Sequence, residues 1–570
     1  MEPQNKDGNL TNKENQQPVK YGTMSGDVNL GFEGDDSQTG NSRLKIERAS
    51  STLSASLNNL AVGLEEREQW GSQVEFILAT MGYAVGIGNV WRFPYLAYEN
   101  GGGSFLIPYT IMLLFAGLPL FFMEFSIGQY FKKGPLKVFQ EINPLAKGLG
   151  IAMMICTMYV AIYYNIILAW TIFYMVSGFA SELPWIDGNN VSKTEQYFND
   201  EMLGRGDDIT WSNFGTIKWQ LVICLAGAWL VVCGALVKGV KGTGKVVYFT
   251  VLFPYVILIV FFINGLRLEG ASKGIMFYIT PEWDKLADVT VWHKAANQIF
   301  FSLGITWGGH LTMASFNKFN NNCHRDAILV AFVNCGTSVF AGFVVFSYLG
   351  YMADQTGQKV EEVVKSGPAL AFIVYPEAMS TLPVPQLWSF LFFFMLFLLG
   401  LDSMFGYTET LVTGVTDQFK CLESQKHWVV IATCSAGFLL GLSMVTEGGV
   451  YLLTLLDAKC ASWNMTMMAI FEIILVAWVY GTDKLFDNIS EMEMQLPKIV
   501  KMYWWVCWKF VTPALLMAMA ALTFMDKSVL KYNNYEFPYS IQIVGWVIGA
   551  SSVMFIPLFA LYACVMNKTS

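Results

Sequence analysis

An apolar stretch at residues 81–103 contains residues that a plain membrane span would not tolerate. Its sequence is MGYAVGIGNVWRFPYLAYENGGG, with glycines in the middle and polar residues directly after them: Gly82, Gly86, Gly88, Asn89 and Arg92. Interrupting a helix in lipid leaves backbone N–H and C=O groups unpaired, which is costly unless protein or a cavity surrounds them. Freed backbone groups at membrane depth coordinate ions or receive charged substrate groups. The stretch therefore predicts a binding site inside the membrane.

A second apolar segment is interrupted in the same way at residues 302–309, which read SLGITWGG. Counting apolar segments places this break in the sixth span, five spans after the first break. Broken helices at matching positions of two halves indicate an inverted repeat with the binding site between the halves. An odd number of spans in each half also gives the halves opposite topologies. We therefore predict two inverted five-helix repeats that meet at the two breaks.

The composition is that of a protein embedded in lipid. Hydrophobic residues make up 54% of the 570 residues and charged residues 14%, against roughly 25% charged in ordinary soluble domains. Twelve apolar segments have spanning length: residues 72–98, 104–128, 149–178, 217–237, 246–265, 292–317, 328–352, 386–418, 427–444, 447–480, 506–526 and 542–566. The prediction is an all-α polytopic membrane protein with twelve transmembrane helices in a lipid bilayer.

Other classes of protein are disfavoured by the motifs that the sequence lacks. The net charge of -8 gives no reason to expect nucleic acid as a partner. The sequence contains no HExxH, GxSxG or Walker motif, so we expect neither an enzyme nor an ATP-driven pump. Its ten cysteines show no CxxC spacing and its four histidines no metal-binding spacing. We expect most of the cysteines to be buried apolar residues.

Several longer strings carry a resemblance to a known family. They are GNVWRFPY at 88–95, NGGGSFLIPY at 100–109, PLFFMEFSIGQY at 119–130, ASFNKFNNNC at 314–323 and GLDSMF at 400–405. From about residue 70 to 566 the chain resembles the neurotransmitter:sodium symporter family, whose transport depends on sodium and chloride. The resemblance implies the leucine-transporter-like fold, with helices 1 and 6 broken.

The chain divides into a polar tail and a transporter domain. Residues 1–70 are rich in Asn, Gln, Ser, Lys and Glu, and we expect them to form a disordered cytoplasmic tail. The transporter domain is expected to comprise residues 71–566, with the first repeat at 72–265, the second at 292–480, and helices 11 and 12 in 506–566. Lysine and arginine in the short loops after spans 2, 4 and 6 place both termini in the cytoplasm. Loop 179–216 is then extracellular, with a glycosylation sequon at Asn190, on a plasma-membrane protein.

The resemblance also implies how a substrate is bound. In the family, freed backbone N–H groups and a tyrosine hydroxyl receive a carboxylate, and the matching residues are Ile87, Gly88 and Tyr164. Monoamine transporters carry Asp at the position of Gly86, so the substrate of this chain should bring its own carboxylate. The other residues expected at the substrate are Tyr83, Phe301, Ser302, Gly304, Trp307, Ser403 and Tyr407. A Tyr164 that serves packing alone is the alternative.

Two sodium sites and one chloride site follow from the same resemblance. The first sodium site draws its oxygens from the substrate carboxylate and from Ala84, Asn89, Ser302 and Asn334. The second draws them from Gly82, Val85, Leu399, Asp402 and Ser403. The chloride site comprises Tyr109, Gln298, Ser302, Asn334 and Ser338. A carboxylate such as Asp402 within an apolar span is costly and marks function by default, although a hydrogen-bonded structural acid is the alternative.

Two ion pairs are expected to close the site from opposite sides of the membrane. Arg92 and Asp457 match the outer pair. Arg67, with Trp70, matches the inner partner of Asp417. The alternative is that either pair serves structure alone. Three further acids in the spans are assigned structural roles: Glu124, Glu409 and Glu472.

The size of the substrate is expected to be set by two aromatic side chains. Trp307 stands where the family commonly has Phe, and Tyr407 where many members have Gly or a small aliphatic residue, so both shrink the side-chain pocket. Gly304 returns some room near the amine. The strings TWGG and TMASFNKF resemble glycine carriers. The alternative is that Trp307 and Tyr407 point away from the site.

Three features depart from the pattern of the glycine carriers. Asp402-Ser403 replaces a Gly-Thr pair and matches broader neutral amino-acid and amine carriers. Loop 179–216 lacks the usual pair of cysteines, and Phe316 replaces a Tyr near the inner gate.

The hypothesis is a sodium- and chloride-coupled symporter for a small neutral amino acid, with glycine as the first choice. Three alternatives stay open: a symporter for larger neutral amino acids, a ligand-gated channel, and a membrane partner or sensor that transports nothing. Homo-oligomerisation is left open as well.

Overall fold

The computed structural model of the chain describes residues 67–186, 192–206, 208–360, 370–380, 382–460, 462–525, 529–532 and 535–569. Residues from Arg67 onward form one compact unit. The predicted tail before Arg67 and the sequon at Asn190 lie outside the described residues.

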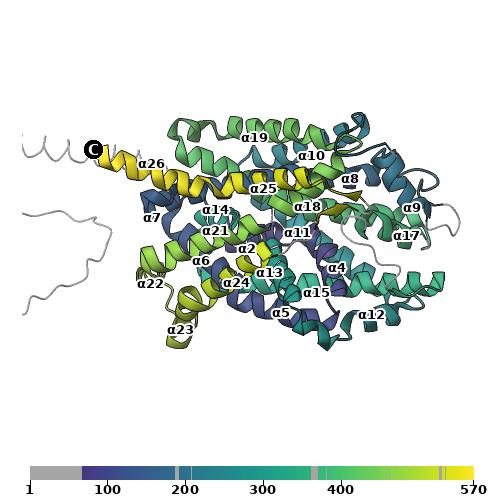
Figure 1. Cartoon of the computed structure of the whole chain (residues 1–570), viewed down its shortest axis with the longest axis horizontal. Coiled ribbons are helices and arrows are strands. Elements are labelled where there is room, and N and C mark those ends of the chain that lie inside the picture. Colours follow the sequence, from purple (N-terminus) through teal and green to yellow (C-terminus); the bar gives the residue numbers. More distant parts are fainter. Residues whose placement is uncertain are drawn as a thin grey trace, which may run out of the picture. The chain divides into compact units, whose positions relative to one another are not determined.

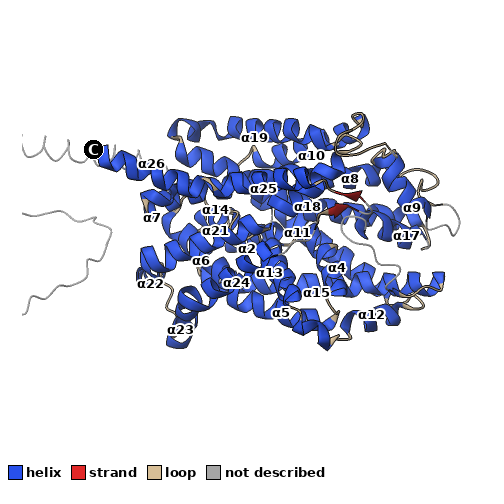
Figure 2. Ribbon diagram, in the orientation of Figure 1, coloured by secondary structure: helices blue, strands red, loops and turns tan. Residues whose placement is uncertain are grey.

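Nearly all of the described chain is helical, and most of the long helices run roughly parallel to one another (Figure 1). Figure 2 shows the small exception in the described residues, an antiparallel pair of two-residue strands, β1 (Lys531–Tyr532) and β2 (Tyr535–Glu536). The chain is therefore all-α, as predicted.

The helices of the first half extend to residue 279. They are α2 (Gln73–Ala84), α3 (Ile87–Val90), α4 (Arg92–Glu99), α5 (Leu106–Met112), α6 (Leu118–Phe131), α7 (Pro135–Ile142), α8 (Lys147–Ser177), α9 (Ser192–Gln196), α10 (Trp219–Leu236), α11 (Val240–Gly265) and α12 (Ala271–Ile279). A π-helical turn at Leu113–Gly117 joins α5 to α6 in one span.

The second half begins with α13 (Val289–Leu303) and α14 (Gly309–Ser315), on either side of the second break. The remaining helices are α15 (Cys323–Thr356), α17 (Tyr375–Ser380), α18 (Pro385–Gln418), α19 (Lys426–Gly441), α20 (Gly449–Cys460), α21 (Trp463–Ile474), α22 (Thr482–Glu491), α23 (Lys498–Val506), α24 (Thr512–Met525), α25 (Tyr539–Val553) and α26 (Phe555–Thr569).

The predicted spans correspond to these helices. Within the described residues, nine helices are long and apolar enough to cross a membrane, or up to eleven if each bent pair is one span. One bent pair joins α2 to α3 and α4 at 60°, and the other joins α25 to α26 at 41°. The predicted sixth span consists of α13 and α14, which the five residues 304–308 separate. With that broken span included, the helices account for the twelve predicted segments.

Highly exposed apolar side chains mark the surfaces that would face lipid. On α10, Ile223 is 72% exposed and Leu230 is 71% exposed. In water, such a surface would be an exposed apolar patch, but in a bilayer it meets hydrocarbon. By contrast, 78% of the most apolar stretch of the span that contains α8 is buried, against 33% for α10. Thus α8 belongs to the interior of the bundle and α10 to its edge.

The helix ends that matter for the site are fixed by local chemistry. Ser72 precedes α2, and its hydroxyl accepts a hydrogen bond from the Glu75 N–H at 3.2 Å, as an N-cap residue does. Asp288 caps α13 in the same way through the Thr290 N–H. Gly304 ends α13 in the left-handed conformation (φ +62°), which glycine adopts without a steric cost.

Candidate functional site

The first break is short and lies between α2 and α3. Val85 and Gly86 separate the two helices, and both have extended backbone conformations. The Gly86 N–H donates to the side-chain oxygen of Asn89 at 3.0 Å, and the Ile87 N–H donates to the Tyr164 hydroxyl at 3.0 Å. A tyrosine on α8 therefore lies against the freed backbone, at the place where the sequence predicts a carboxylate to be received.

Gly86 leaves room that no other residue would leave. An added Cβ would lie 2.6 Å from the Tyr164 hydroxyl oxygen and 2.8 Å from the Ser403 hydroxyl oxygen. Both distances are shorter than real Cβ contacts. The backbone of the first break thus lies directly beside two hydroxyl groups from α8 and α18, and glycine is required for that approach.

The second break is longer and is held by side chains from other segments. Three residues in it have positive φ values: Gly304, Thr306 and Gly308. The Thr306 N–H donates to Glu124 on α6 at 2.6 Å, and the Thr157 hydroxyl on α8 donates to the Trp307 carbonyl at 2.7 Å. His310 of α14 hydrogen-bonds through Nε2 to the Leu303 carbonyl, across the break. These contacts satisfy backbone groups that the interrupted helix leaves unpaired.

Four polar side chains meet where the first sodium site is predicted. The side-chain N–H₂ of Asn89 lies 2.8 Å from Asn334 Oδ1, 2.8 Å from the Ser338 hydroxyl and 3.3 Å from the Ser302 hydroxyl. Asn334 Nδ2 donates to Ser302 at 2.9 Å. All four are at most 5% exposed. A cluster of hydroxyl and amide oxygens is the donor set that a hard cation prefers. Ala84, whose carbonyl completes the prediction, is buried at the end of α2.

The predicted chloride residues contain buried donors with no partner. The Tyr109 hydroxyl and both side-chain polar atoms of Gln298 have no hydrogen-bond partner among the described residues. Tyr109 is 2% exposed and Gln298 is fully buried. Leaving such groups unpaired costs about 1–3 kcal/mol each. The unpaired donors are the Tyr109 hydroxyl and Gln298 Nε2, which suit an anion, whereas the Ser302 and Ser338 hydroxyls already donate to Asn334.

The residues predicted for the second sodium site lie on α2, in the first break and on α18. Asp402 is 3% exposed, and a Cβ on Gly82 would lie 2.8 Å from its Cβ. The Ser403 hydroxyl lies 3.3–3.5 Å from three carbonyl oxygens, which belong to Gly82, Tyr83 and Leu399. Hydroxyl and carbonyl oxygens thus lie close together beside Ser403, and Asp402 lies against Gly82 of the same helix pair. Val85 is buried in the adjacent break.

Five aromatic rings surround the expected position of the substrate side chain. Trp307 makes edge contacts with Phe301 (5.6 Å between ring centroids) and Tyr407 (5.5 Å). Tyr407 in turn contacts Tyr83 (5.3 Å) and Tyr164 (5.7 Å). Trp307 and Tyr407 therefore face the residues predicted to bind substrate. Neither ring lines the cavity described below, so whether they border the substrate stays a prediction.

Tyr83 is packed into this wall by three glycines. An added Cβ on Gly304, Gly309 or Gly406 would lie within 2.9 Å of the Tyr83 side chain. Any larger residue at these positions would displace the ring. The predicted role of Gly304 is thereby altered, because Tyr83 fills the space that Gly304 leaves.

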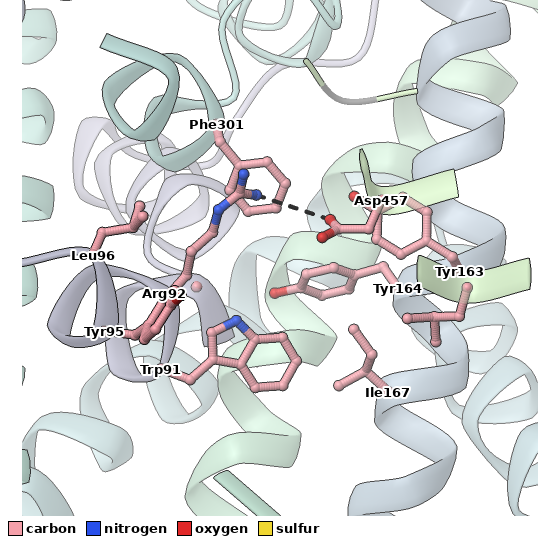
Figure 3. A pocket seen from close by; sticks show the side chains of 11 residues that line it. Trp91, Arg92, Tyr95, Leu96, Tyr163, Tyr164, Ile167, Phe301 and Asp457 are labelled. Carbon is pink, nitrogen blue, oxygen red and sulfur yellow. Dashed lines mark ion pairs between the residues drawn. The ribbon is translucent and has the colours of Figure 1, made fainter. Parts of the chain in front are cut away.

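A cavity of about 240 Å³ lies on the outer side of the site. It is lined by Gly88, Trp91, Arg92, Tyr95, Leu96, Tyr163, Tyr164, Ile167, Phe301, Leu453 and Asp457. Figure 3 shows Arg92 and Asp457 pointing toward each other across it, with the Phe301 ring beside the guanidinium group. Their closest charged atoms are 3.9 Å apart, and Asp457 is 43% exposed. This pair is therefore a loose contact whose carboxylate is partly exposed.

The inner predicted pair is much tighter. Arg67 Nη1 reaches both carboxylate oxygens of Asp417, at 3.0 and 2.8 Å, and both side chains are less than 20% exposed. The Trp70 indole N–H donates to the Met313 carbonyl at 2.9 Å. Arg67 also lies 4.6 Å from the centre of the Phe316 ring. Several contacts therefore hold the predicted inner pair together, whereas a cavity lies beside the predicted outer pair.

Some residues of the site were not predicted from the sequence. Thr250 on α11 donates to Asp402 at 2.5 Å, from 152 positions away. Thr157 donates to Trp307 from 150 positions away. Local sequence carries no signal for such distant partners. His310 did carry a signal, because it is a polar residue in an apolar span. The four histidines of the chain show no metal-binding spacing, however, and the sequence pointed to no other role for His310.

Comparisons with known proteins give the family of the chain. The family model described as "Sodium:neurotransmitter symporter family" matches residues 67–193 and 188–567. Glycine transporter 1 of Xenopus laevis, described as sodium- and chloride-dependent, is 42% identical over 87% of this chain and 84% of its own length. Glycine transporter 2 of the same species is 41% identical, over 86% and 68%.

A relative with a broader name is equally similar. The human sodium- and chloride-dependent neutral and basic amino acid transporter B(0+) is 41% identical over 91% of this chain and 90% of its own length. Overall sequence identity to these relatives thus does not decide between glycine and other neutral amino acids as the substrate. That decision depends on the residues around the breaks.

Proposed function

We propose, since the chain belongs to the sodium:neurotransmitter symporter family, that it is a sodium- and chloride-coupled symporter that imports a small neutral amino acid, most favourably glycine. Uptake proceeds by alternating access across the plasma membrane, with both termini in the cytoplasm, loop 179–216 outside and Asn190 as its glycosylation site. The relatives' names support the class of substrate and the two ions.

One observation carries this proposal: the contact between Tyr164 and the first break. The Ile87 N–H and the Tyr164 hydroxyl are 3.0 Å apart and buried, and no acid stands at Gly86. The Tyr164 hydroxyl accepts from the Ile87 N–H and keeps its own proton, which suits the carboxylate of an amino acid. A substrate without a carboxylate would leave this donor unused.

Glycine is favoured over larger amino acids by the aromatic wall. A side chain on the substrate would have to displace Trp307 or Tyr407, whose rings already contact each other and their neighbours. Adding methylene groups to a packed site costs about 1–3 kcal/mol. Relatives named for glycine and a relative named for neutral and basic amino acids are equally similar, so a broader neutral amino-acid symporter is the second candidate.

The two ends of the path support alternating access. The outer pair, Arg92 and Asp457, is separated by 3.9 Å beside a cavity, whereas Arg67 and Asp417 are in direct contact. A substrate could enter from outside while the inner pair stays closed. The sodium ions that accompany it move down their gradient, and each net positive charge gains about 2.3 kcal/mol per 100 mV.

The experiment is uptake of radiolabelled glycine into cells that express the full chain. Sodium and chloride are replaced in turn, unlabelled glycine and leucine compete, and Trp307→Phe is measured alongside. We expect glycine uptake that requires both ions, weak inhibition by leucine, and stronger inhibition by leucine in the variant. Strong inhibition of the unmodified chain by leucine but not by glycine would instead support the broader symporter.

A further inference from the structure

One oxygen of Asp402 is held by a helix that has no other role in the predicted sites. Thr250 lies on α11, and its hydroxyl oxygen is 2.5 Å from Asp402 Oδ1. Both residues are 3% exposed. Since α11 packs against both α2 and α18, Thr250 faces the seam where the first break meets Asp402.

The Thr250 hydroxyl has a choice of two acceptors. It also lies 3.2 Å from the Val246 carbonyl of its own helix. A threonine hydroxyl carries a single proton, so it donates fully to one acceptor at a time. The contact with Asp402 is the shorter, and hydrogen bonds to a carboxylate are stronger than those to a neutral carbonyl. The carboxylate of Asp402 is therefore the main acceptor.

This hydrogen bond fixes the direction of the carboxylate. Asp402 already lies against Gly82, where an added Cβ would meet its side chain at 2.8 Å. With Oδ1 occupied by Thr250, the rotation of the carboxyl group is restricted, and its other oxygen remains for a cation. An ion site gains affinity when its ligands are oriented before the ion arrives, because less freedom is lost on binding.

Thr250 also lies one turn before a proline that interrupts the hydrogen bonds of α11. Pro254 lies four residues further along α11. Proline has no N–H, so the Thr250 carbonyl lacks its usual partner in the helix, and helices bend at such positions. Bending of α11 at this point would move the Thr250 hydroxyl relative to Asp402.

We propose that Thr250 is a positioning residue for sodium: it orients Asp402 and thereby raises the affinity of the second sodium site. This inference rests on the proposed function, because it concerns an ion that the symporter would carry. Thr250 does not itself have to touch the ion or the amino acid.

The test compares the sodium dependence of glycine uptake among variants of the full chain. Thr250→Val keeps the shape and removes the hydroxyl, and Thr250→Ser keeps the hydroxyl. We expect the sodium concentration for half-maximal uptake to rise about three- to tenfold in Thr250→Val and to stay near the original value in Thr250→Ser. The chloride concentration for half-maximal uptake should not change, because the Thr250 hydroxyl bonds to Asp402 and Val246, neither of which is a predicted chloride residue.

A matched control is available on the same helix. Thr243 is 6% exposed, and its hydroxyl donates to the Gly239 carbonyl at 3.3 Å. Thr243→Val removes a similar buried hydroxyl and should leave the sodium dependence unchanged. If Thr250→Val fails to reach the cell surface, Thr250→Ala, which avoids a methyl group beside the carboxylate, replaces it in the comparison.

The outcomes separate the inference from the proposed function. Uptake by the unmodified chain that ignores sodium would overturn the proposed function. Sodium-dependent uptake whose half-maximal concentration is the same in Thr250→Val, Thr250→Ala and the unmodified chain would overturn the role of Thr250 alone. Equal changes in sodium and chloride dependence would indicate a general structural defect and would also overturn it.

Discussion

The two breaks in the helices resemble each other in sequence but differ in how they are held. The first spans Val85 and Gly86, with extended backbone. The second spans residues 304–308 and has positive φ values at Gly304, Thr306 and Gly308. A positive φ is costly for Thr306, a β-branched residue, and persists only where the surroundings enforce it.

The partners of the two breaks explain the difference. At the first break, one N–H is bound by Asn89 of the same segment and the other by the Tyr164 hydroxyl. At the second, Glu124 and Thr157 bind backbone groups from two other helices, and His310 binds one from the broken span itself. The first break is therefore held by one side chain from another helix, whereas the second is held by two.

The largest effect should follow from filling the first break. In Gly86→Ala, the added Cβ would overlap the Tyr164 and Ser403 hydroxyl groups. Overpacking of about 1–3 kcal/mol corresponds to a loss of roughly 5- to 150-fold in apparent affinity for glycine. The measurement is the concentration dependence of glycine uptake, normalised to the protein at the cell surface.

Gly227→Ala is the control for this substitution. Gly227 lies on α10, and an added Cβ there would meet no atom within 4 Å. Its uptake should equal that of the unmodified chain. If Gly86→Ala also transported glycine with unchanged affinity, the first break would not be the place where the ligand binds.

A smaller effect is expected when one of the hydrogen bonds that hold the second break is removed. His310→Leu removes the hydrogen bond to the Leu303 carbonyl and leaves this buried acceptor unpaired, at a cost of about 1–3 kcal/mol. Ser302 directly precedes Leu303 and belongs to the predicted ion cluster. We therefore expect the sodium concentration for half-maximal uptake to rise roughly threefold to tenfold. Glycine uptake at saturating sodium should persist.

His310→Gln provides the matched comparison, because its side-chain amide can donate to the same carbonyl. We expect it to restore most of the sodium affinity that His310→Leu loses. Equal sodium dependence in the two variants and the unmodified chain would mean that the second break holds its shape without His310, and the contrast between the breaks would be weaker than described.

The sequence predicted the first break better than the second. Gly82, Gly86 and Gly88 mark the first break because only glycines bring the backbone so close to Asp402, Tyr164 and Phe301. The same reasoning located the second break from Gly304 and Gly308. The number of spans followed from their hydropathy alone, since lipid imposes length and apolar composition on each helix.

What the sequence did not predict depends on contacts between distant residues. The strained backbone of Thr306 is stabilised by Glu124, 182 positions earlier, to which only a structural role was assigned. The space near Gly304 is filled by the Tyr83 ring. Neither follows from local spacing, because both result from helix packing. Trp307 and Tyr407, which the resemblance singled out as limiting the size of the substrate, are in ring contact.

The most direct test of the central claim uses the purified full chain in liposomes with imposed ion gradients. The account predicts that glycine accumulates inside above its external concentration, only when sodium and chloride are both present outside, and that a sodium ionophore abolishes the accumulation. Glycine that merely equilibrates across the membrane, at a rate independent of both ions, would contradict coupled symport and favour a channel.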